Sequence, residues 1–257
     1  MIAFIALYRE AFIWLRRDKI FGPILMAGVV ISLFANIASN WTIEEFSRIL
    51  FDVGIAGFRI TGGLIAILWG SRMIHDAIAE RSLDPRLASP ISRNTWYLAR
   101  YCALATVLFI MGLAYFLAWQ VIMHLNGQGL TSHIQNWAFG MLFFEWLILA
   151  ALSMLLATLS GFGMSLFSTT ALWIIGIFAP LVAASKDIQL DPLQAVVINL
   201  FSSIWNFHRF NILDDLAISG QNILQYDDLV SRLLWIISLL ATLLVAGTWR
   251  FTERDLN

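Results

Sequence analysis

Charged residues are scarce in this chain of 257 residues. Asp, Glu, Lys and Arg together make up 13% of the sequence, and lysine occurs only twice. This is about half of the charge that covers an ordinary soluble domain. The net charge is −1, and no basic patch outside the loops could meet phosphates, so nucleic acid is excluded as a partner. The composition instead predicts a protein that lies in lipid.

Cysteine and metal-ligand patterns are also nearly absent. The single cysteine, Cys102, has no partner for a disulfide within the chain and is expected to be a small core residue. The four histidines show no ligand spacing, and no motif for a nucleophile, a zinc hydrolase or clustered acids occurs. No catalytic residue and no metal site is therefore predicted, and the chain is not expected to be an enzyme or to bind a cofactor itself.

Long apolar runs are what the sequence has in place of charge. Residues 20–43 and 146–185 carry no charged side chain, and residues 102–136 carry only histidines. A helix needs about 20 such residues to cross ~30 Å of hydrocarbon. The fold class is therefore predicted as an all-α integral membrane protein with a single transmembrane domain over residues 1–257. Its six spans are expected at about 20–39, 53–74, 98–123, 136–158, 163–184 and 230–250.

An amphipathic helix is predicted before the first span, over residues 3–19. Arg9 and Arg16, and likewise Glu10 and Arg17, are seven residues apart and share one face, while apolar side chains cover the other. Such a helix lies flat in a membrane interface, with Arg9, Arg16 and Arg17 directed toward the lipid headgroups. The same pattern fits an amphipathic helix packed on another subunit, and the sequence leaves both interpretations open.

The distribution of Lys and Arg predicts the orientation in the membrane. With the N-terminus inside, eleven of the sixteen basic residues fall on the cytoplasmic side. Both termini and the loop at residues 75–96 are then cytoplasmic. Residues 185–229 form an outer cap, in which an apolar run at 193–205 is too short to cross and predicts a re-entrant or interfacial helix. A second short helix is expected at about 209–219.

The stretch ERSLDPRLASPISR, residues 80–93, is a charged segment between two long apolar runs. Span two is expected to continue as a helix through Arg72, Asp76 and Glu80, whose spacing allows pairing along one face. Pro85 ends that helix, and Ser89 and Pro90 begin a new one that leads into span three. We interpret the segment as a rigid bent element below the membrane. A solvated loop that only fixes orientation is the alternative.

This segment, with NTWYLAR after it, resembles the loop after the second span in permease subunits of ABC type-2 exporters. Asp84 and Arg86 depart from the family pattern, which more usually has aliphatic or aromatic residues there. The stretches WRFTERDL and FHRFNILDDLAISGQNILQYDDLV resemble the last region of the family. The residues that match the loop pattern are Arg81, Leu83, Pro85, Leu87, Ala88, Pro90, Ile91, Ser92 and Arg93.

The resemblance implies a permease subunit of the bacterial inner membrane that pairs with a second permease copy or a related permease. It also implies an ABC ATPase subunit, which binds ATP and Mg, docked on a coupling helix. The residues expected to carry the coupling are Glu80, Arg81, Leu83, Pro85, Arg86, Leu87, Pro90, Ser92 and Arg93. Independently, the only lysines, Lys19 and Lys186, do not follow a glycine-rich turn, so the chain cannot bind ATP through a P-loop. An ATP-independent carrier or channel is the alternative function.

Two charges fall in the interior of predicted spans, away from the span ends. Arg59 in span two and Glu145 in span four each lie ~10–14 Å below the outer interface, at 1.5 Å per residue. Because either charge would be costly in hydrocarbon without a partner, an ion pair between them is predicted. The pair belongs either to a substrate pathway or gate, or to a structural link between the two spans.

Overall fold

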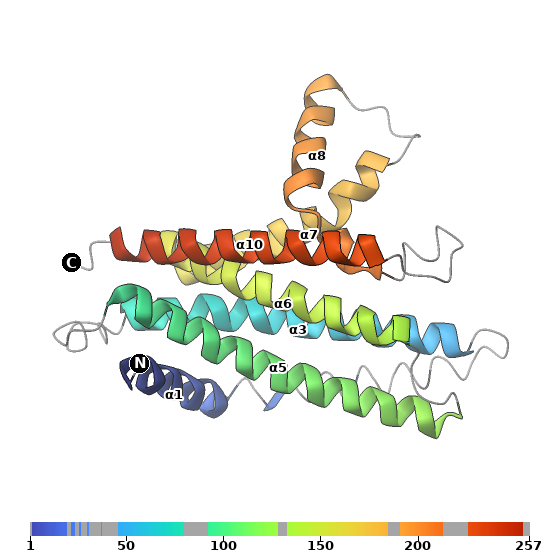
Figure 1. Cartoon of the computed structure of the whole chain (residues 1–257), viewed down its shortest axis with the longest axis horizontal. Helices are drawn as coiled ribbons and strands as arrows, with labels where there is room; N and C mark the ends of the chain where they lie inside the picture. The colour runs from blue at the N-terminus through green and yellow to red at the C-terminus, as the bar shows by residue number, and fades with distance from the viewer. Residues whose placement is uncertain are drawn as a thin grey trace.

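The computed structural model describes residues 2–19, 46–79, 92–127, 133–184, 191–212 and 226–253, and isolated residues between 22 and 37. Within these ranges the regular structure is helical and contains no strand, which confirms the predicted all-α class. In chain order the elements are α1 (Ile2–Arg17), α3 (Phe46–Ala79), α5 (Arg93–Leu125), α6 (His133–Leu159), α7 (Phe162–Ala184), α8 (Pro192–Ile204), the 3-10 helix η1 (Phe207–Phe210) and α10 (Tyr226–Glu253) (Figure 1).

Four of these helices are long and apolar enough to cross a membrane. They contain the stretches Phe51–Ile78, Arg93–Leu125, Gln135–Leu159 and Leu229–Glu253, which correspond to the second, third, fourth and last predicted spans. In α7 the described apolar stretch, Phe162–Phe178, is shorter. The first predicted span, 20–39, lies outside the described residues except for isolated positions. The chain therefore has the helices of a multi-pass membrane protein.

Helix α3 packs against α5, α6 and α7, and three of its glycines lie directly against tryptophan rings of these helices. A Cβ atom at these glycines would overlap a tryptophan ring, so the missing side chain is what allows the ring to lie against the backbone of α3. Each ring comes from a different neighbouring helix: Gly54 faces Trp119 of α5, Gly62 faces Trp146 of α6, and Gly63 faces Trp173 of α7.

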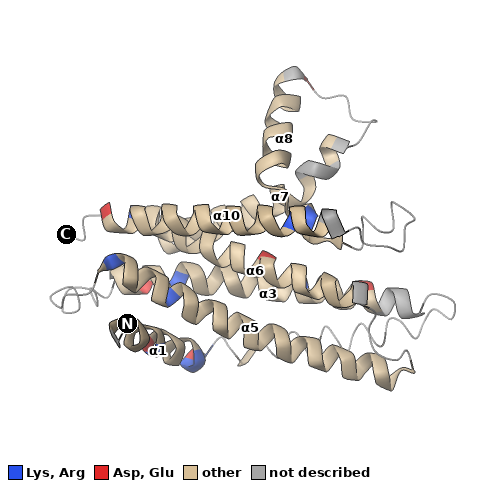
Figure 2. Ribbon diagram, in the orientation of Figure 1, with Lys and Arg blue, Asp and Glu red and all other residues tan. Residues whose placement is uncertain are grey.

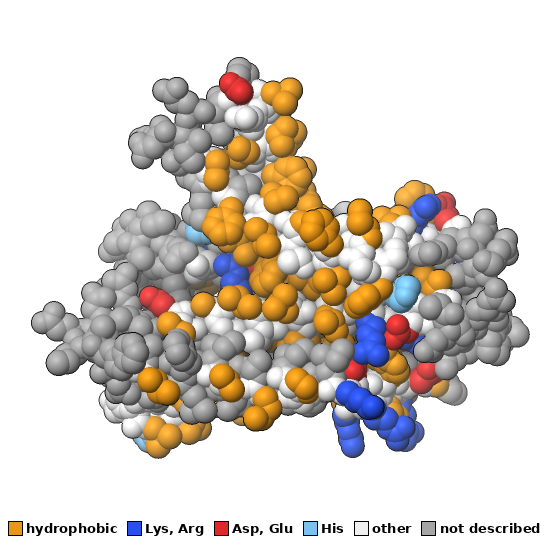
Figure 3. Space-filling model, turned by 180° about the vertical axis from the view of Figure 1, so that it is seen from behind, with side chains coloured by type: hydrophobic (Ala, Val, Ile, Leu, Met, Phe, Trp, Pro, Cys, Tyr) orange, Lys and Arg blue, Asp and Glu red, His pale blue; other side chains and the backbone are white. Residues whose placement is uncertain are grey.

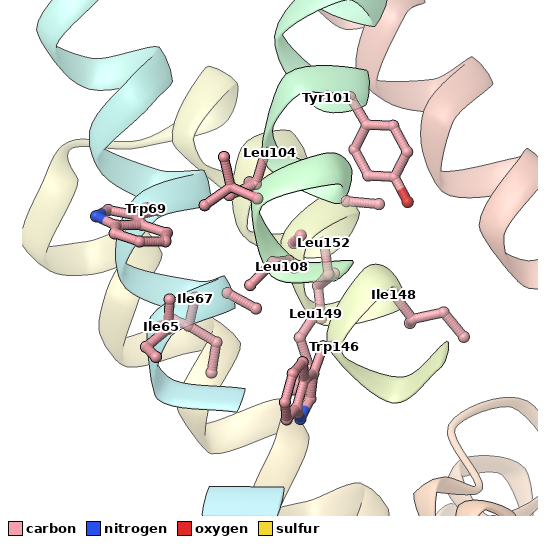
Figure 4. Packing of buried hydrophobic residues seen from close by; sticks show 14 of the residues in the cluster. Ile65, Ile67, Trp69, Tyr101, Leu104, Leu108, Trp146, Ile148, Leu149 and Leu152 are labelled. Atoms are coloured by element: carbon pink, nitrogen blue, oxygen red, sulfur yellow. The ribbon is translucent and has the colours of Figure 1, made fainter. Parts of the chain in front are cut away.

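Apolar side chains fill the space between α3, α5 and α6. Trp69 of α3, Leu104 and Leu108 of α5 and Leu149 of α6 are fully buried, and Figure 4 shows them among the side chains gathered between these helices. At the edge of this core, the Tyr101 hydroxyl donates to a backbone carbonyl of α6 at 3.2 Å. This part of the core thus lies between three of the four long helices.

Buried hydroxyl groups connect α3, α6 and α7 within this core. Ser165 of α7 donates to the carbonyl of Ser153 in α6 at 3.0 Å. Its only hydroxyl proton is used there, so the Ser71 hydroxyl of α3, 2.9 Å from the Ser165 oxygen, must donate to it. All three serines are fully buried. Hydrocarbon offers polar groups no partners, so these hydrogen bonds satisfy the hydroxyls and link the helices.

Helix α1 packs on α5. Its apolar side buries Leu7, Ala11 and Leu15, and the Tyr8 hydroxyl donates to Thr106 Oγ1 of α5 at 3.0 Å. The predicted amphipathic helix is therefore present, and a helix of the same chain covers its apolar side. The sequence pattern gave no indication of this partner, because periodicity shows that a face is apolar and does not show what covers it.

Cys102 is exposed on α5, so the prediction that it is a core residue is wrong. A thiol is small and weakly polar, and it can therefore face hydrocarbon at little cost. In a helix that crosses a membrane, apolar character alone does not distinguish a buried position from one that faces lipid.

Helix α8 stands away from the long helices at a steep angle, beside the end of α7 (Figure 1). It occupies the apolar run predicted at 193–205. Asp191 and Gln194 form a capping box at its start, and proline is its first residue. The 3-10 helix η1 follows it and packs on α6 and α7. The second predicted outer helix, about 209–219, falls largely outside the described residues.

Candidate functional site

Arg59 and Glu145, the two charges predicted inside the membrane, form an ion pair. The Arg59 Nε atom lies 3.1 Å from Oε1 and 3.0 Å from Oε2 of Glu145, and Nη2 donates to Oε1 at 3.0 Å. The Glu145 side chain is fully buried, and that of Arg59 is 13% exposed. The prediction that the two residues pair is therefore confirmed in geometry.

Two further groups complete this cluster, and the sequence did not identify either of them. The indole N–H of Trp173 in α7 donates to Glu145 Oε1, and Arg59 Nη2 donates to the backbone carbonyl of Phe207 in η1 at 3.0 Å. The carboxylate thus receives donors from both α3 and α7, while the guanidinium reaches η1. A tryptophan in an apolar run and a backbone carbonyl carry no signal in the sequence that could have predicted these contacts.

The local sequence explains how α3, α6 and α7 can meet at one carboxylate. Gly62 and Gly63 follow Arg59 by about one turn of α3, and they admit the rings of Trp146 and Trp173. Trp146 is the residue after Glu145, and Trp173 is the donor to Glu145. Because the rings lie against bare backbone, α6 and α7 approach α3 closely enough for the short polar contacts. We call Arg59, Glu145, Trp173 and the Phe207 carbonyl the interior cluster.

A second set of arginines lies near the other end of the bundle. Figure 2 shows Lys and Arg near the end that holds α1 and the C-terminus, with few charges along the middle of the helices. Arg93, the first residue of α5, donates to the carbonyl of Thr252 near the end of α10 at 3.0 Å. Beside it the rings of Trp96 and Phe251 stack, with centroids 5.1 Å apart. The start of α5 is thus fixed to the end of α10.

Arg72 and Arg100 connect α1, α3 and α5 at the same end. Arg72 of α3 binds Asp18, just after α1, at 2.9 Å, and Asp76 one turn further along α3 at 3.1 Å. Arg100 of α5 is buried, donates to the Met73 carbonyl of α3 at 3.3 Å and lies over the ring of Trp96. The predicted pairing of Arg72 with Asp76 is confirmed, whereas the contact with Asp18 was not predicted.

We call Arg72, Arg93 and Arg100 the end arginines. Together their contacts join α1, α3, α5 and α10 next to the two helix ends, Ala79 and Arg93, that flank residues 80–91. These contacts differ from the interior cluster because their acceptors are spread over several helix segments, whereas the interior cluster is centred on one buried carboxylate.

Most of the predicted coupling residues lie outside the described residues. These are Glu80, Arg81, Leu83, Pro85, Arg86, Leu87 and Pro90. Of the remaining two, Ser92 caps α5: its backbone is extended, and its hydroxyl accepts from the Thr95 amide at 3.2 Å. The helix therefore begins at Arg93, and the prediction that it begins at Ser89 and Pro90 is wrong. A helix cap needs an extended residue, and Ser92 provides one three residues later.

The three arginines predicted for the interfacial helix, Arg9, Arg16 and Arg17, are all exposed on α1. They take no part in the interior cluster or in the contacts of the end arginines. Among the described residues, no group of three or more His, Cys, Asp or Glu side chains could hold a metal ion.

No family model matches the chain, and no curated protein matches it. The family resemblance therefore rests on the sequence motifs and the predicted topology alone.

Proposed function

We propose that this chain is the transmembrane permease subunit of an ATP-binding cassette exporter. It would have six spans, with α1 at the inner interface, residues 75–96 as the cytoplasmic coupling loop and residues 185–229 as the outer cap. It would lie in a bacterial inner membrane with both termini in the cytoplasm. ATP and Mg would be bound by a separate ATPase subunit, and a second permease copy would complete the pathway.

The observation that carries the proposal is the position of the end arginines. Residues 80–91 connect the end of α3 with the start of α5, and the end arginines fix these two ends to α1 and α10. A displacement of the loop would therefore move four helix segments together. Transmission of force between subunits requires packed elements of this kind, because a flexible attachment would absorb the movement.

The interior cluster would provide the second half of the coupling. It joins α3, which receives the movement at its inner end, to α6, α7 and η1. A shift of α3 would then change the position of the outer elements, including the segment from which α8 projects. Glu145 is buried and ion-paired, so we assign this cluster to transmission of movement and not to direct contact with a transported molecule.

The first experiment is purification of the full chain from its native membrane in a mild detergent, with identification of bound proteins and an ATPase assay. We expect a soluble subunit with a P-loop to copurify and to hydrolyse ATP. Absence of such a subunit, even after crosslinking, would contradict the proposal.

Two charge reversals separate docking from internal coupling. Arg86→Glu alters the predicted docking segment, and we expect it to release the ATPase subunit. Arg93→Glu removes the guanidinium that binds the Thr252 carbonyl, so we expect the subunit to stay bound while hydrolysis no longer drives transport. Normal transport in both variants would remove the coupling role of this loop.

A carrier or channel that works without ATP is the second candidate. The interior cluster is the observation that favours it, since buried ionisable groups in spans often mark pathways for ions or protons. This function predicts flux that follows an ion gradient and is lost in Glu145→Gln without any effect of ATP depletion. The exporter function predicts transport that stops on ATP depletion and does not follow an ion gradient.

A further inference from the structure

A cleft of about 620 Å³ lies between the end of α1 and the side of α3. Its volume falls within the range of roughly 300–1,000 Å³ that is usual for small-molecule sites. It is therefore large enough for a polar group of several atoms and larger than a single bound ion requires. None of the functions considered above uses this cleft.

The charges that line the cleft are unequally satisfied. The acids have partners: Asp18 binds Arg72 at 2.9 Å, and Glu10 lies 4.0 Å from Arg100. Arg17 and Lys19 also line the cleft, are exposed, and make no contact with an acid in the described part of the chain. Figure 3 shows Lys and Arg side chains projecting beside a mixed acidic and basic patch at this end of the molecule. The charge left for a ligand is positive, so the ligand should be an anion.

One wall of the cleft is apolar. It is formed by Ile13, which is 39% exposed, and by the half-buried Trp14, whose ring lies 5.7 Å from the Arg72 guanidinium carbon. A free phosphate would have no use for this wall, whereas a phospholipid places glycerol and acyl carbons next to its phosphate. Tryptophan beside arginine is also the usual composition of a membrane interface.

The depth of the cleft agrees with a position at the headgroups. Arg72 follows Arg59 by thirteen residues in α3, a rise of about 20 Å. If Arg59 lies ~10–14 Å below the outer edge of a hydrocarbon layer ~30 Å thick, Arg72 lies at its inner edge. Arg17 and Lys19 are then at the level of the phosphates of the inner leaflet.

We propose that this cleft binds the headgroup of an anionic phospholipid. Arg17 and Lys19 hold the phosphate, Ile13 and Trp14 contact the carbons next to it, and the bound lipid bridges α1 and α3 beside the Arg72–Asp18 ion pair. The site requires only that α3 crosses a membrane, and it does not depend on the assignment as an exporter subunit.

The test uses the purified full-length protein, stripped of native lipid in mild detergent, with bound lipid measured by native mass spectrometry. We expect phosphatidylglycerol to bind about tenfold or more tightly than phosphatidylcholine, since each basic side chain near a phosphate contributes a several-fold preference. Arg17→Gln with Lys19→Gln should reduce this preference to under about threefold. Equal binding of the two lipids by the unaltered protein would overturn the proposal.

Matched variants separate a site from general attraction of anions to α1. Arg9→Gln with Arg16→Gln removes the same charge from exposed positions of the same helix that do not line the cleft, and should keep the preference within about twofold. Arg17→Lys with Lys19→Arg should keep it too, which controls for folding. Equal loss in both Gln pairs would show diffuse attraction only. Displacement of the lipid by inorganic phosphate would show a free-anion site. Either result would overturn the proposal.

Discussion

The interior cluster and the end arginines use the same chemistry in two different surroundings. Glu145 is fully buried, and one guanidinium supplies its only charged partner within the described residues. At the end of the bundle that holds α1, by contrast, the Arg72 side chain is 36% exposed and has two acids as partners. Arg93 binds a carbonyl, so loss of the Arg93 side chain would leave a neutral group and not an unpaired charge. The interior cluster therefore has one buried ion pair at its centre, whereas the end arginines have acceptors on several helix segments.

This difference determines how each region responds to loss of a contact. A buried charge without a partner costs several kcal/mol, whereas an exposed ion pair contributes roughly 0–1 kcal/mol. The interior cluster should therefore behave as a unit that is either intact or broken. The contacts of Arg72 and Arg93 should therefore be lost one at a time, each at a small cost in free energy.

The largest effect is expected for Glu145→Leu. This change leaves the Arg59 charge buried without its partner, and we expect the free energy of unfolding to fall by about 3–5 kcal/mol. Adding Arg59→Met should restore most of the loss, because two apolar side chains then replace the pair. Equilibrium unfolding in mixed micelles measures both variants. If the effects of the two substitutions on the free energy of unfolding are additive, the two residues are not coupled and the interior cluster does not behave as a unit.

The charge-reversed pair sharpens this test. In Arg59→Glu with Glu145→Arg, the new carboxylate would face the Phe207 carbonyl and the new guanidinium would face the indole N–H of Trp173. Both contacts are repulsive, so we expect this variant to recover less of the free energy of unfolding than the apolar pair does. From the sequence alone, the reversal is expected to restore part of the loss caused by either single reversal. The contacts of the pair with Trp173 and Phe207 reduce the recovery that we expect.

An intermediate effect is expected for Gly62→Ala. The added Cβ would overlap the Trp146 ring, and the forced shift would also move the adjacent Glu145 away from Arg59. Overpacking of this kind costs about 1–3 kcal/mol. Gly140→Ala is the matched control, since nothing lies within 4 Å of its added Cβ in α6, and it should be neutral or stabilising by up to ~1 kcal/mol. Thermal unfolding of the two variants measures the difference; equal midpoints would contradict the close approach of α3 and α6.

Hydropathy and charge predicted much of the fold because a helix that crosses a membrane must be apolar and nearly free of charge over its whole length. The predicted fourth and fifth spans, 136–158 and 163–184, lie close to α6 and α7, His133–Leu159 and Phe162–Ala184. The pairing of Arg59 with Glu145 could be predicted from the free-energy cost of an unpaired charge in hydrocarbon, because this cost favours contact between two opposite charges at similar depth.

What could not be predicted involves contacts between residues distant in sequence that carry no local pattern. The cover of α1 by α5, the bond from Trp173 to Glu145, and the bond from Arg72 to Asp18 all depend on how the helices pack. The start of α5 was misplaced for a different reason. Ser89 and Ser92 are both acceptable caps, and only the extended backbone of Ser92 decides between them.

The smallest effects are expected for Arg72 and Arg93, at the end of the bundle that holds α1. Arg72→Gln and Arg93→Gln should each cost about 1 kcal/mol or less, because both residues lie near solvent or headgroups and their partners can be rehydrated. The contacts of Arg72 with Asp18 and Asp76 and that of Arg93 with Thr252 have no residue in common, so the double variant should equal the sum of the single ones within about 0.5 kcal/mol. The same unfolding assay measures all three proteins. A loss well above the sum would mean that the end arginines act as one cooperative unit. The end of the bundle that holds α1 would then resemble the interior cluster, and loss of a single contact would weaken the others.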